Sequence, residues 1–171
     1  DSSPEHLTKQ ENKGATALMY AVDKEQEDIV RALLKHDSSL EHVTKPDKNG
    51  YTALILAVVT GYEGIERVLL EYDKSLEHLT KQDKRGIASL MVAVDKDNEK
   101  IVRMLLEADS STEHLTKQDE HGDTALMVAS QLGNEEIVRM LLKADSSTEH
   151  LTKQENKNGY TALVIAADKG H

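Results

Sequence analysis

The chain has 171 residues, with 31 acidic and 21 basic side chains, a formal net charge of -10 and no Cys, Phe or Trp. Nucleic-acid binding needs a clustered basic face, so this balance argues against a nucleic-acid partner and favours a protein or peptide with a basic segment. The lack of Cys excludes disulfides and thiolate zinc sites. No apolar run approaches the roughly 18 residues of a membrane-spanning helix. We therefore expect a soluble, intracellular and cytoplasmic protein without membrane insertion.

The sequence repeats itself with a period of 36 residues. Residues 109–117 read D-S-S-T-E-H-L-T-K, and residues 145–153 read the same nine letters. Self-similarity at a fixed period of about 20 to 50 residues is typical of solenoid proteins. The whole chain, residues 1–171, is therefore expected to form a single repeat array. In this frame it contains four complete units and a partial fifth, which are residues 1–36, 37–72, 73–108, 109–144 and 145–171.

Each unit is predicted to contain a short apolar helix after its glycine. In four units a threonine precedes this helix, and its hydroxyl can accept a hydrogen bond from the free N–H groups of the first turn. These threonines are Thr16, Thr52, Thr124 and Thr161. The third unit reads G-I-A-S-L at residues 86–90 and lacks the cap. The helices are almost wholly apolar, so we expect them to be packed on both sides. Their core positions include Met19, Ile55, Met91, Met127 and Val164.

A second, amphipathic helix is predicted in each complete unit, over segments such as I-V-R-M-L-L. An isoleucine followed by leucines four and five residues later forms one buried stripe. The stripe begins at Ile29, Ile65, Ile101 and Ile137. In the second unit Glu66 replaces the valine that other units have at the next position. Asn98 and Asn134 are expected to cap the N-termini of these helices.

Left-handed glycines are expected to end the first helix in three units, at Gly61, Gly133 and Gly170. The first and third units have Glu25 and Asp97 at this position. A side chain in the left-handed region is strained, so these two turns are predicted weak points of the array.

The pattern G-x-T-A-L-x-x-A, a turn, and then I-V-R-x-L-L resembles the ankyrin repeat along the whole chain. The resemblance implies an all-α solenoid of helix-turn-helix units with short β-hairpin-like fingers, whose concave face binds proteins. The chain departs from the family's usual T-P-L-H, because it reads T-A-L followed by Met, Ile or Val. Its period of 36 residues also exceeds the usual 33. The finger, or the connection that leads to it, is therefore expected to be longer.

Histidines recur in register at His6, His42, His78, His114 and His150. Successive units stack on the order of 10 Å apart, whereas zinc needs its ligands at about 2.0–2.1 Å. We therefore predict finger residues beside a glutamate and no metal site; an acid-sensitive rearrangement is the alternative. The nearby group of His114, Asp119 and His121 matches no metal-ligand spacing. No carboxylate pair, nucleophile motif or phosphate loop predicts catalysis or a cofactor.

The resemblance nominates partner-binding positions beside the finger glycine and at the end of the first helix. They are Lys48, Asn49, Tyr51, Val59, Thr60, Lys84, Arg85, Ile87, Asp95, Lys96, Glu120, His121, Asp123, Gln131 and Leu132. Tyr51, Ile87 and Leu132 stand out, because apolar and aromatic anchors contribute most of the energy at many interfaces. Tyr51 has a second interpretation, which is packing on the neighbouring finger. Lys48, Lys84 and Arg85 could also meet an acidic segment locally.

The expected function is a non-catalytic protein-interaction scaffold. The alternative is a structural array that assembles with itself through uncapped ends or spaces other domains. Neither end has the polar outer face of a capping unit, so we expect a window cut from a longer array. The differences between units favour natural divergence over a designed scaffold.

Overall fold

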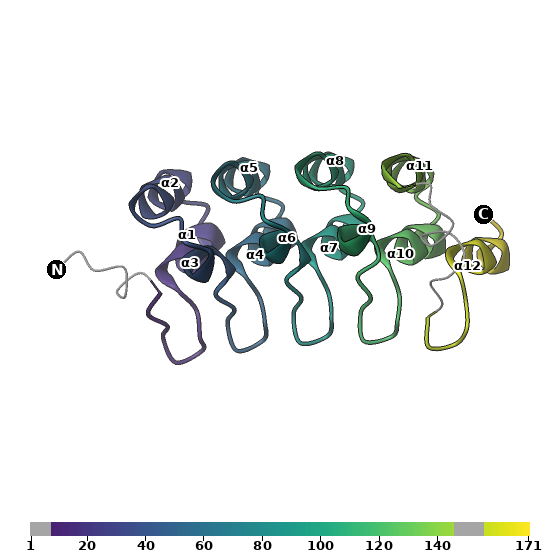
Figure 1. Ribbon diagram of the computed structural model, residues 1–171, viewed down its shortest axis with the longest axis horizontal. Coiled ribbons are helices and arrows are strands. Elements are labelled where there is room, and N and C mark those ends of the chain that lie inside the picture. The colour runs from purple at the N-terminus through teal and green to yellow at the C-terminus, as the bar shows by residue number, and fades with distance from the viewer. Residues whose placement is uncertain (1–7, 146–155) are drawn as a thin grey trace.

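The computed structural model describes residues 8–145 and 156–171, in which the chain forms a row of helices with loops along one edge (Figure 1). The helices are α1 (Ala17–Asp23), α2 (Glu27–His36), α3 (Leu40–Thr44), α4 (Ala53–Thr60), α5 (Glu63–Tyr72), α6 (Leu76–Thr80), α7 (Ser89–Asp95), α8 (Glu99–Ala108), α9 (Thr112–Leu115), α10 (Ala125–Leu132), α11 (Glu135–Ala144) and α12 (Ala162–Lys169). The only β-pairing in these residues is an isolated bridge between Gln82 and Ala88.

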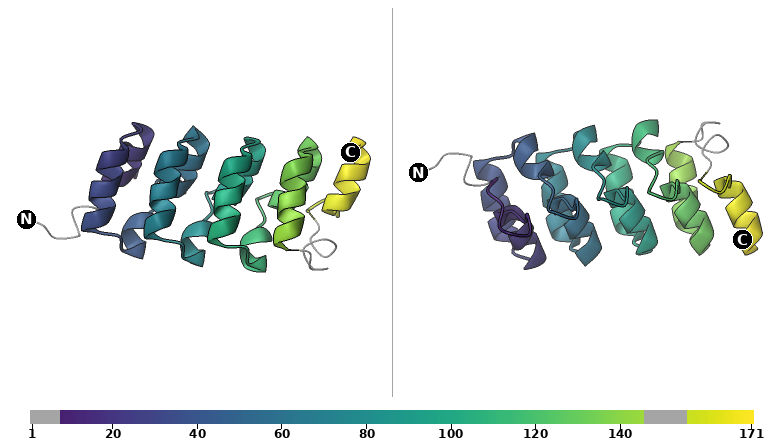
Figure 2. Two further views of the ribbon diagram at one scale, coloured as in Figure 1. Left: turned by 90° about the horizontal axis from the view of Figure 1, so that it is seen from above. Right: turned by 90° about the horizontal axis from the view of Figure 1, so that it is seen from below.

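Two layers of helices make up the array. The first helices α1, α4, α7, α10 and α12 pack side by side in one layer, and the second helices α2, α5, α8 and α11 pack in the other. Both views of Figure 2 show the units following one another along one axis. Each finger, the loop that precedes a first helix, projects away from the second helices (Figure 1). This arrangement confirms the predicted all-α solenoid.

The first helices begin as the threonine pattern predicts. The hydroxyls of Thr16, Thr52, Thr124 and Thr161 accept hydrogen bonds from the backbone N–H three residues later. Ala88 stands at the same position of α7 and makes no such bond. Gly61, Gly133 and Gly170 end their helices in the left-handed conformation, as predicted. Glu25 and Asp97 adopt the same conformation, with φ of 53° at both.

Three of the four isoleucines that begin the predicted stripe are buried in the second helices. Ile65, Ile101 and Ile137 are fully buried, whereas Ile29 is 45% exposed. Ile137 is buried although α11 is the last described helix of its layer, so the preceding unit covers this position. Ile29 belongs to the first described helix of that layer and has no such cover. Of the two asparagines predicted as caps, Asn98 accepts a hydrogen bond from the Ile101 N–H, whereas the Asn134 side chain makes no capping hydrogen bond.

The core prediction also fails in α12. Val164 in α12 is 45% exposed, whereas the corresponding Met19, Ile55, Met91 and Met127 are buried. No second helix packs against α12 within the described residues, so this side chain stays open to solvent. Leu163 beside it is 75% exposed for the same reason.

Among the residues that the structure describes, three of the units contain a third, short helix that was not predicted. In α3, α6 and α9 a serine before the helix accepts a hydrogen bond from the histidine N–H. One apolar residue of each helix, Val43, Leu79 or Leu115, is fully buried and anchors the segment to the core. In these three units the longer period is therefore used in a helical connection before the finger.

This helix also corrects the prediction about the histidines. His42, His78 and His114 are not finger residues, because they lie on α3, α6 and α9 and are buried. Their Nδ1 atoms donate to the backbone carbonyls of Asp37, Asp73 and Asp109 at 2.6–2.9 Å. Each ring thus joins the short helix to the end of the second helix. His6 and His150 lie outside the described residues.

Candidate interaction groove

The second, third and fourth fingers are tight loops, each held by an aspartate side chain. Oδ1 of Asp47 accepts hydrogen bonds from the N–H groups of Asn49 and Tyr51, both at 2.8 Å. Asp83 makes the same pair of bonds to Arg85 and Ile87 at 2.8 and 2.9 Å. Asp119 repeats the arrangement in the next finger. The side chains that follow these aspartates are therefore presented on a fixed backbone.

Neighbouring fingers are also bonded to one another. The Lys84 N–H donates to the Asn49 carbonyl at 3.0 Å, and the Glu120 N–H donates to the Arg85 carbonyl at 2.7 Å. The fingers can approach this closely because a glycine faces the next loop. A Cβ atom on Gly50 would lie 2.8 Å from the Cα of Asp83, which is closer than carbon atoms approach without a clash.

A hollow of about 400 Å³ lies between the fingers and the first helices. Its apolar lining comes from α4, α7 and α10, and its polar lining comes mainly from the fingers and the end of α7. The lining residues are Tyr51, Val59, Arg85, Ile87, Met91, Val92, Asp95, Lys96, Asp119 and Val128. Its size is within the range of binding pockets, and its lining combines apolar side chains with the charged Arg85, Asp95, Lys96 and Asp119.

Six of the nominated partner-binding residues line this hollow, and they are Tyr51, Val59, Arg85, Ile87, Asp95 and Lys96. The hollow therefore brings together Tyr51 and Ile87. Leu132, the third nominated anchor, is 46% exposed at the end of α10 and lies outside the lining.

The remaining nominated residues are divided between the finger tips and the helix ends. Lys48, Asn49, Lys84, Glu120, His121 and Gln131 are exposed. Thr60 and Asp123 are engaged within the array. The Thr60 hydroxyl donates to the Leu56 carbonyl at 2.9 Å, and Asp123 accepts from the Asn156 side chain at 2.8 Å. These two residues have less freedom to meet a partner.

One polar contact links two walls of the hollow. The guanidinium of Arg85 donates to Oδ2 of Asp83 at 3.2 Å and to the Tyr51 hydroxyl at 3.4 Å. The hydrogen bond with Asp83 raises the pKa of Arg85 above its usual value. Tyr51 therefore contacts the neighbouring finger, and it also contributes to the lining.

Sequence reasoning missed the floor of the hollow. Met91 is buried in the core as predicted and also borders the hollow, whereas the prediction did not include Val92 and Val128. The sequence contained one signal of this surface. Tyr20 of the first unit is in register with Val92 and Val128, and the Tyr20 side chain is 49% exposed. Tyrosine and valine differ widely in volume, and a close-packed core is sensitive to such changes, so this position is expected to face a surface.

The described residues hold no group of three or more His, Cys, Asp or Glu side chains that could bind a metal ion. His114 is buried on α9, whereas His121 stands exposed on a finger, so these two rings do not converge. In residues 8–145 and 156–171, no helix has the length and apolar character needed to cross a membrane.

The comparisons with known proteins agree with this architecture. The family model for ankyrin repeats, which spans three copies of the repeat, matches residues 3–78, 74–150 and 90–171. Together these matches cover the chain from residue 3 to its last residue. No curated protein sequence matches the chain.

Proposed function

Because the chain belongs to the ankyrin repeat family, we propose that it is a non-catalytic scaffold that binds a protein or peptide between its fingers and first helices. Ankyrin repeats are in general protein–protein interaction modules. We call the proposed binding surface the groove face, and define it as the finger tips from Lys13 to Asn158, the hollow, and the ends of α4, α7 and α10. The second helices form the opposite face.

The observation that carries the proposal is the hollow itself. It combines an apolar floor of Met91, Val92 and Val128 with side chains from three successive fingers, each of which is hydrogen-bonded to the next. A preformed site loses less conformational entropy on binding than a flexible one. The finger-to-finger bonds therefore favour the groove face as the place where a partner is recognised.

Site-specific photo-crosslinking tests this proposal. A photo-reactive amino acid is placed at Ile87, in the wall of the hollow, or at Arg103, on the exposed surface of α8. After irradiation in a lysate of the source cells, we expect a heterologous protein to be crosslinked from position 87 and not from position 103. Crosslinking from position 103 alone would contradict the proposal, because the partner would then occupy the second helices.

Self-assembly through the ends is a second candidate function. In the described residues α12 exposes Leu163 at 75% and Val164 at 45%, while α2 exposes Ile29 at 45%. Apolar surfaces at the two ends of an array can stack head to tail. Sedimentation equilibrium distinguishes this candidate, since Leu163→Glu should then lower the average mass of the protein while Ile87→Ser leaves it unchanged.

A further inference from the structure

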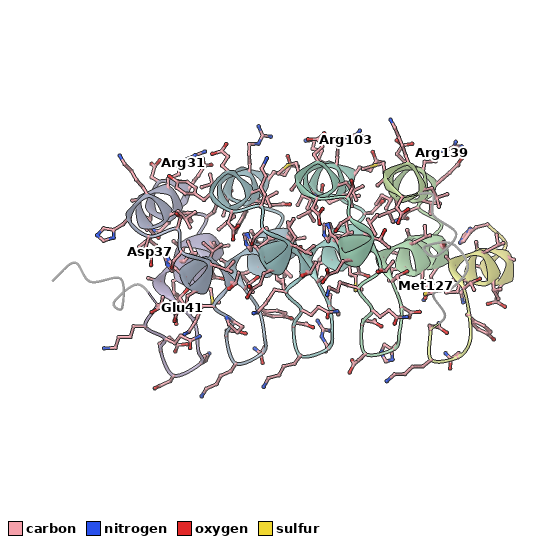
Figure 3. The ribbon with its side chains drawn as sticks, viewed as in Figure 1. Arg31, Asp37, Glu41, Arg103, Met127 and Arg139 are labelled. Carbon is pink, nitrogen blue, oxygen red and sulfur yellow. The ribbon has the colours of Figure 1, made fainter. Side chains whose placement is uncertain are left out.

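The finger tips are cationic although the chain as a whole is acidic. The finger glycines are Gly14, Gly50, Gly86, Gly122 and Gly159. The two residues before them include Lys13, Lys48, Lys84–Arg85 and Lys157, and all of these side chains are exposed. Nitrogen-tipped side chains project from the fingers along the lower edge of Figure 3. The fourth finger is the exception, because its tip is Glu120–His121. A cationic row thus extends from the first finger to the third and is interrupted at the fourth.

The finger-tip lysines are free to meet a partner, whereas the finger aspartates are not. Lysines of the connecting segments pair with nearby glutamates, as Lys45 does with Glu41 at 3.2 Å. Within residues 8–145 and 156–171, no ion pair involves Lys48 or Lys84. By contrast, Asp83 is 8% exposed and is engaged by its own loop and by Arg85. Among the described residues, the unpaired charge at the tips of the first three fingers is therefore positive and comes from Lys13, Lys48 and Lys84, whereas Arg85 is paired with Asp83.

The hollow lies next to this cationic row. Arg85 and Lys96 stand at its margin, with Asp95 as the opposing charge. Asp119 also lines it, but Oδ1 of that carboxylate already accepts from the N–H groups of His121 and Asp123. A ligand whose apolar side chain fills the hollow would therefore have cationic finger tips on one side and the acidic fourth tip on the other.

Repeat geometry sets the spacing of such a ligand. Stacked units are on the order of 10 Å apart, and an extended peptide advances about 3.3 Å per residue. Successive finger tips thus match every third residue of an extended segment. The side chains that meet Lys48 and Lys13 would follow the anchor at about three-residue intervals.

On this basis, and resting on the proposed function, we propose that the groove face binds an extended acidic peptide segment. One apolar side chain of the segment fills the hollow, and its Asp or Glu side chains run toward Lys84, Lys48 and Lys13. The acidic residues lie on one side of the anchor, because Glu120 repels carboxylates on the other. This partner differs from the basic segment that the net charge of the whole chain suggests.

The test is selection of random peptides of about twelve residues, displayed on phage, against the 171-residue chain. We expect enriched peptides to carry a Leu, Ile, Phe or Met with Asp or Glu clustered to one side. For a synthetic copy of the best peptide, Lys48→Glu/Lys84→Glu should weaken binding on the order of tenfold or more, since two favourable charge contacts become repulsive. Glu120→Lys should improve binding of a peptide with acidic residues on both sides of the anchor.

A matched control separates the local effect from net charge. Lys35→Glu/Lys143→Glu changes the net charge equally, but both lysines are exposed on second helices. This control should leave the dissociation constant within about twofold, because charges farther away than the Debye length of about 8 Å are largely screened at physiological salt. Circular dichroism establishes that each variant is folded. Equal weakening by both double variants would overturn the proposal.

The outcomes also separate this proposal from the proposed function. Enrichment of basic peptides whose binding is lost in Ile87→Asp would overturn the acidic partner and retain the groove face. Peptides of any charge that still bind Ile87→Asp would count against the groove face itself. Selection without any enriched sequence would overturn the proposed acidic peptide, because a rigid site with this spacing must discriminate among random segments. In that case the crosslinking experiment at position 87 would still test the scaffold function on its own.

Discussion

Glu66 in α5 occupies the place that Val102 holds in α8, one repeat later, and both side chains are fully buried. Neither carboxylate oxygen of Glu66 has a hydrogen-bond partner among the described residues. Burial, together with the negative charge of Glu63, raises the pKa of Glu66 to about 8. The side chain is therefore mainly protonated in the folded protein at neutral pH, whereas it is ionised in the unfolded chain.

Replacing Glu66 by valine should stabilise the protein. The pKa rises from 4.5 to about 8 on folding, so the original chain loses stability as the pH rises from 4.5 toward 8. At pH 7 the difference between the folded and unfolded pKa of Glu66 lowers the free energy of unfolding by about 3 kcal/mol. We expect Glu66→Val to raise the free energy of unfolding by that order, measured by urea denaturation at pH 5, 6, 7 and 8. The gain should be smallest at pH 5.

Glu66→Gln provides the matched control, because it keeps the size and polarity of the side chain and removes its titration. Its stability should vary less with pH than that of the original chain over the same range. Parallel pH profiles for the original chain and both variants would show that Glu66 has no raised pKa.

The histidines of the short helices should make the fold sensitive to acid. Burial lowers the pKa of His78 and of His114, against the opposing effects of the Asp73 and Asp109 hydrogen bonds. Asp73 and Asp109 also place carboxylate oxygens at 3.7 and 3.8 Å from the two rings. Nε2 of each ring has no partner among the described residues. The rings are therefore neutral in the folded protein and gain protons more readily in the unfolded chain.

A group with a lowered folded-state pKa contributes stability above its unfolded pKa, which is about 6.5 for histidine, and this contribution is lost as the pH falls. Glu66 acts in the opposite direction, so the measurement is best made in Glu66→Val. We expect the free energy of unfolding of this variant to fall between pH 7.5 and pH 5.5. Adding His78→Asn and His114→Asn, which retain a side-chain N–H donor, should reduce the slope. An unchanged slope would mean that other groups cause the acid sensitivity.

Much of the fold follows from local patterns that recur in the sequence. The threonine caps and left-handed glycines act within a few residues of the chain, so their roles at Thr52 and Gly61 were predictable. The third helix was missed because it is short and buries a single apolar residue, such as Leu79, in a largely polar segment. Its stability comes from that one buried contact, the serine cap and the histidine ring.

The candidate site was predictable only in outline. Tyr51 and Ile87 were nominated by their position beside a finger glycine, and they meet in the hollow. The floor at Val92 and Val128 depends on how neighbouring helices are spaced, which no single unit encodes. Likewise, Ile29 and Val164 match the core pattern of their units, and their exposure depends on which neighbours pack against them.

Asp97 marks a strained turn that glycine should relieve. Its φ of 53° lies in the left-handed region, where a side chain costs roughly 1–2 kcal/mol relative to glycine. Aspartate tolerates this region better than most residues, so we expect Asp97→Gly to raise the free energy of unfolding by about 0.5–1 kcal/mol. Urea denaturation measures the change. A loss of stability would indicate that the Asp97 side chain stabilises the turn.

Leu105 tests the assignment of the buried stripe. Its side chain is fully buried in α8, so Leu105→Ala should lower the free energy of unfolding by about 2–5 kcal/mol. Ile29→Ala is the control from the same stripe, and its 45% exposure predicts a loss below about 1 kcal/mol. Similar losses for the two variants would contradict this assignment, because either Leu105 would then be exposed or Ile29 would be buried.

Gly86 and Gly61 share a φ of 77° but differ in their surroundings. No atom lies within 4 Å of the Cβ that alanine would add at Gly61, so Gly61→Ala should cost only the backbone strain, about 1 kcal/mol. At Gly86 the added Cβ would lie 2.9 Å from the Cα of Asp119 in the next finger. Gly86→Ala must therefore separate two fingers in addition to bearing the same strain.

We expect Gly86→Ala to lower the free energy of unfolding by at least about 1 kcal/mol more than Gly61→Ala, in the range of overpacking. It should also disturb the hollow, because Arg85 and Ile87 flank the glycine and both line that site. Urea denaturation gives the stability difference, and titration with a selected peptide gives the loss of affinity. If both variants lost equal stability and Gly86→Ala bound the peptide normally, the close finger contact would have no role in positioning the site.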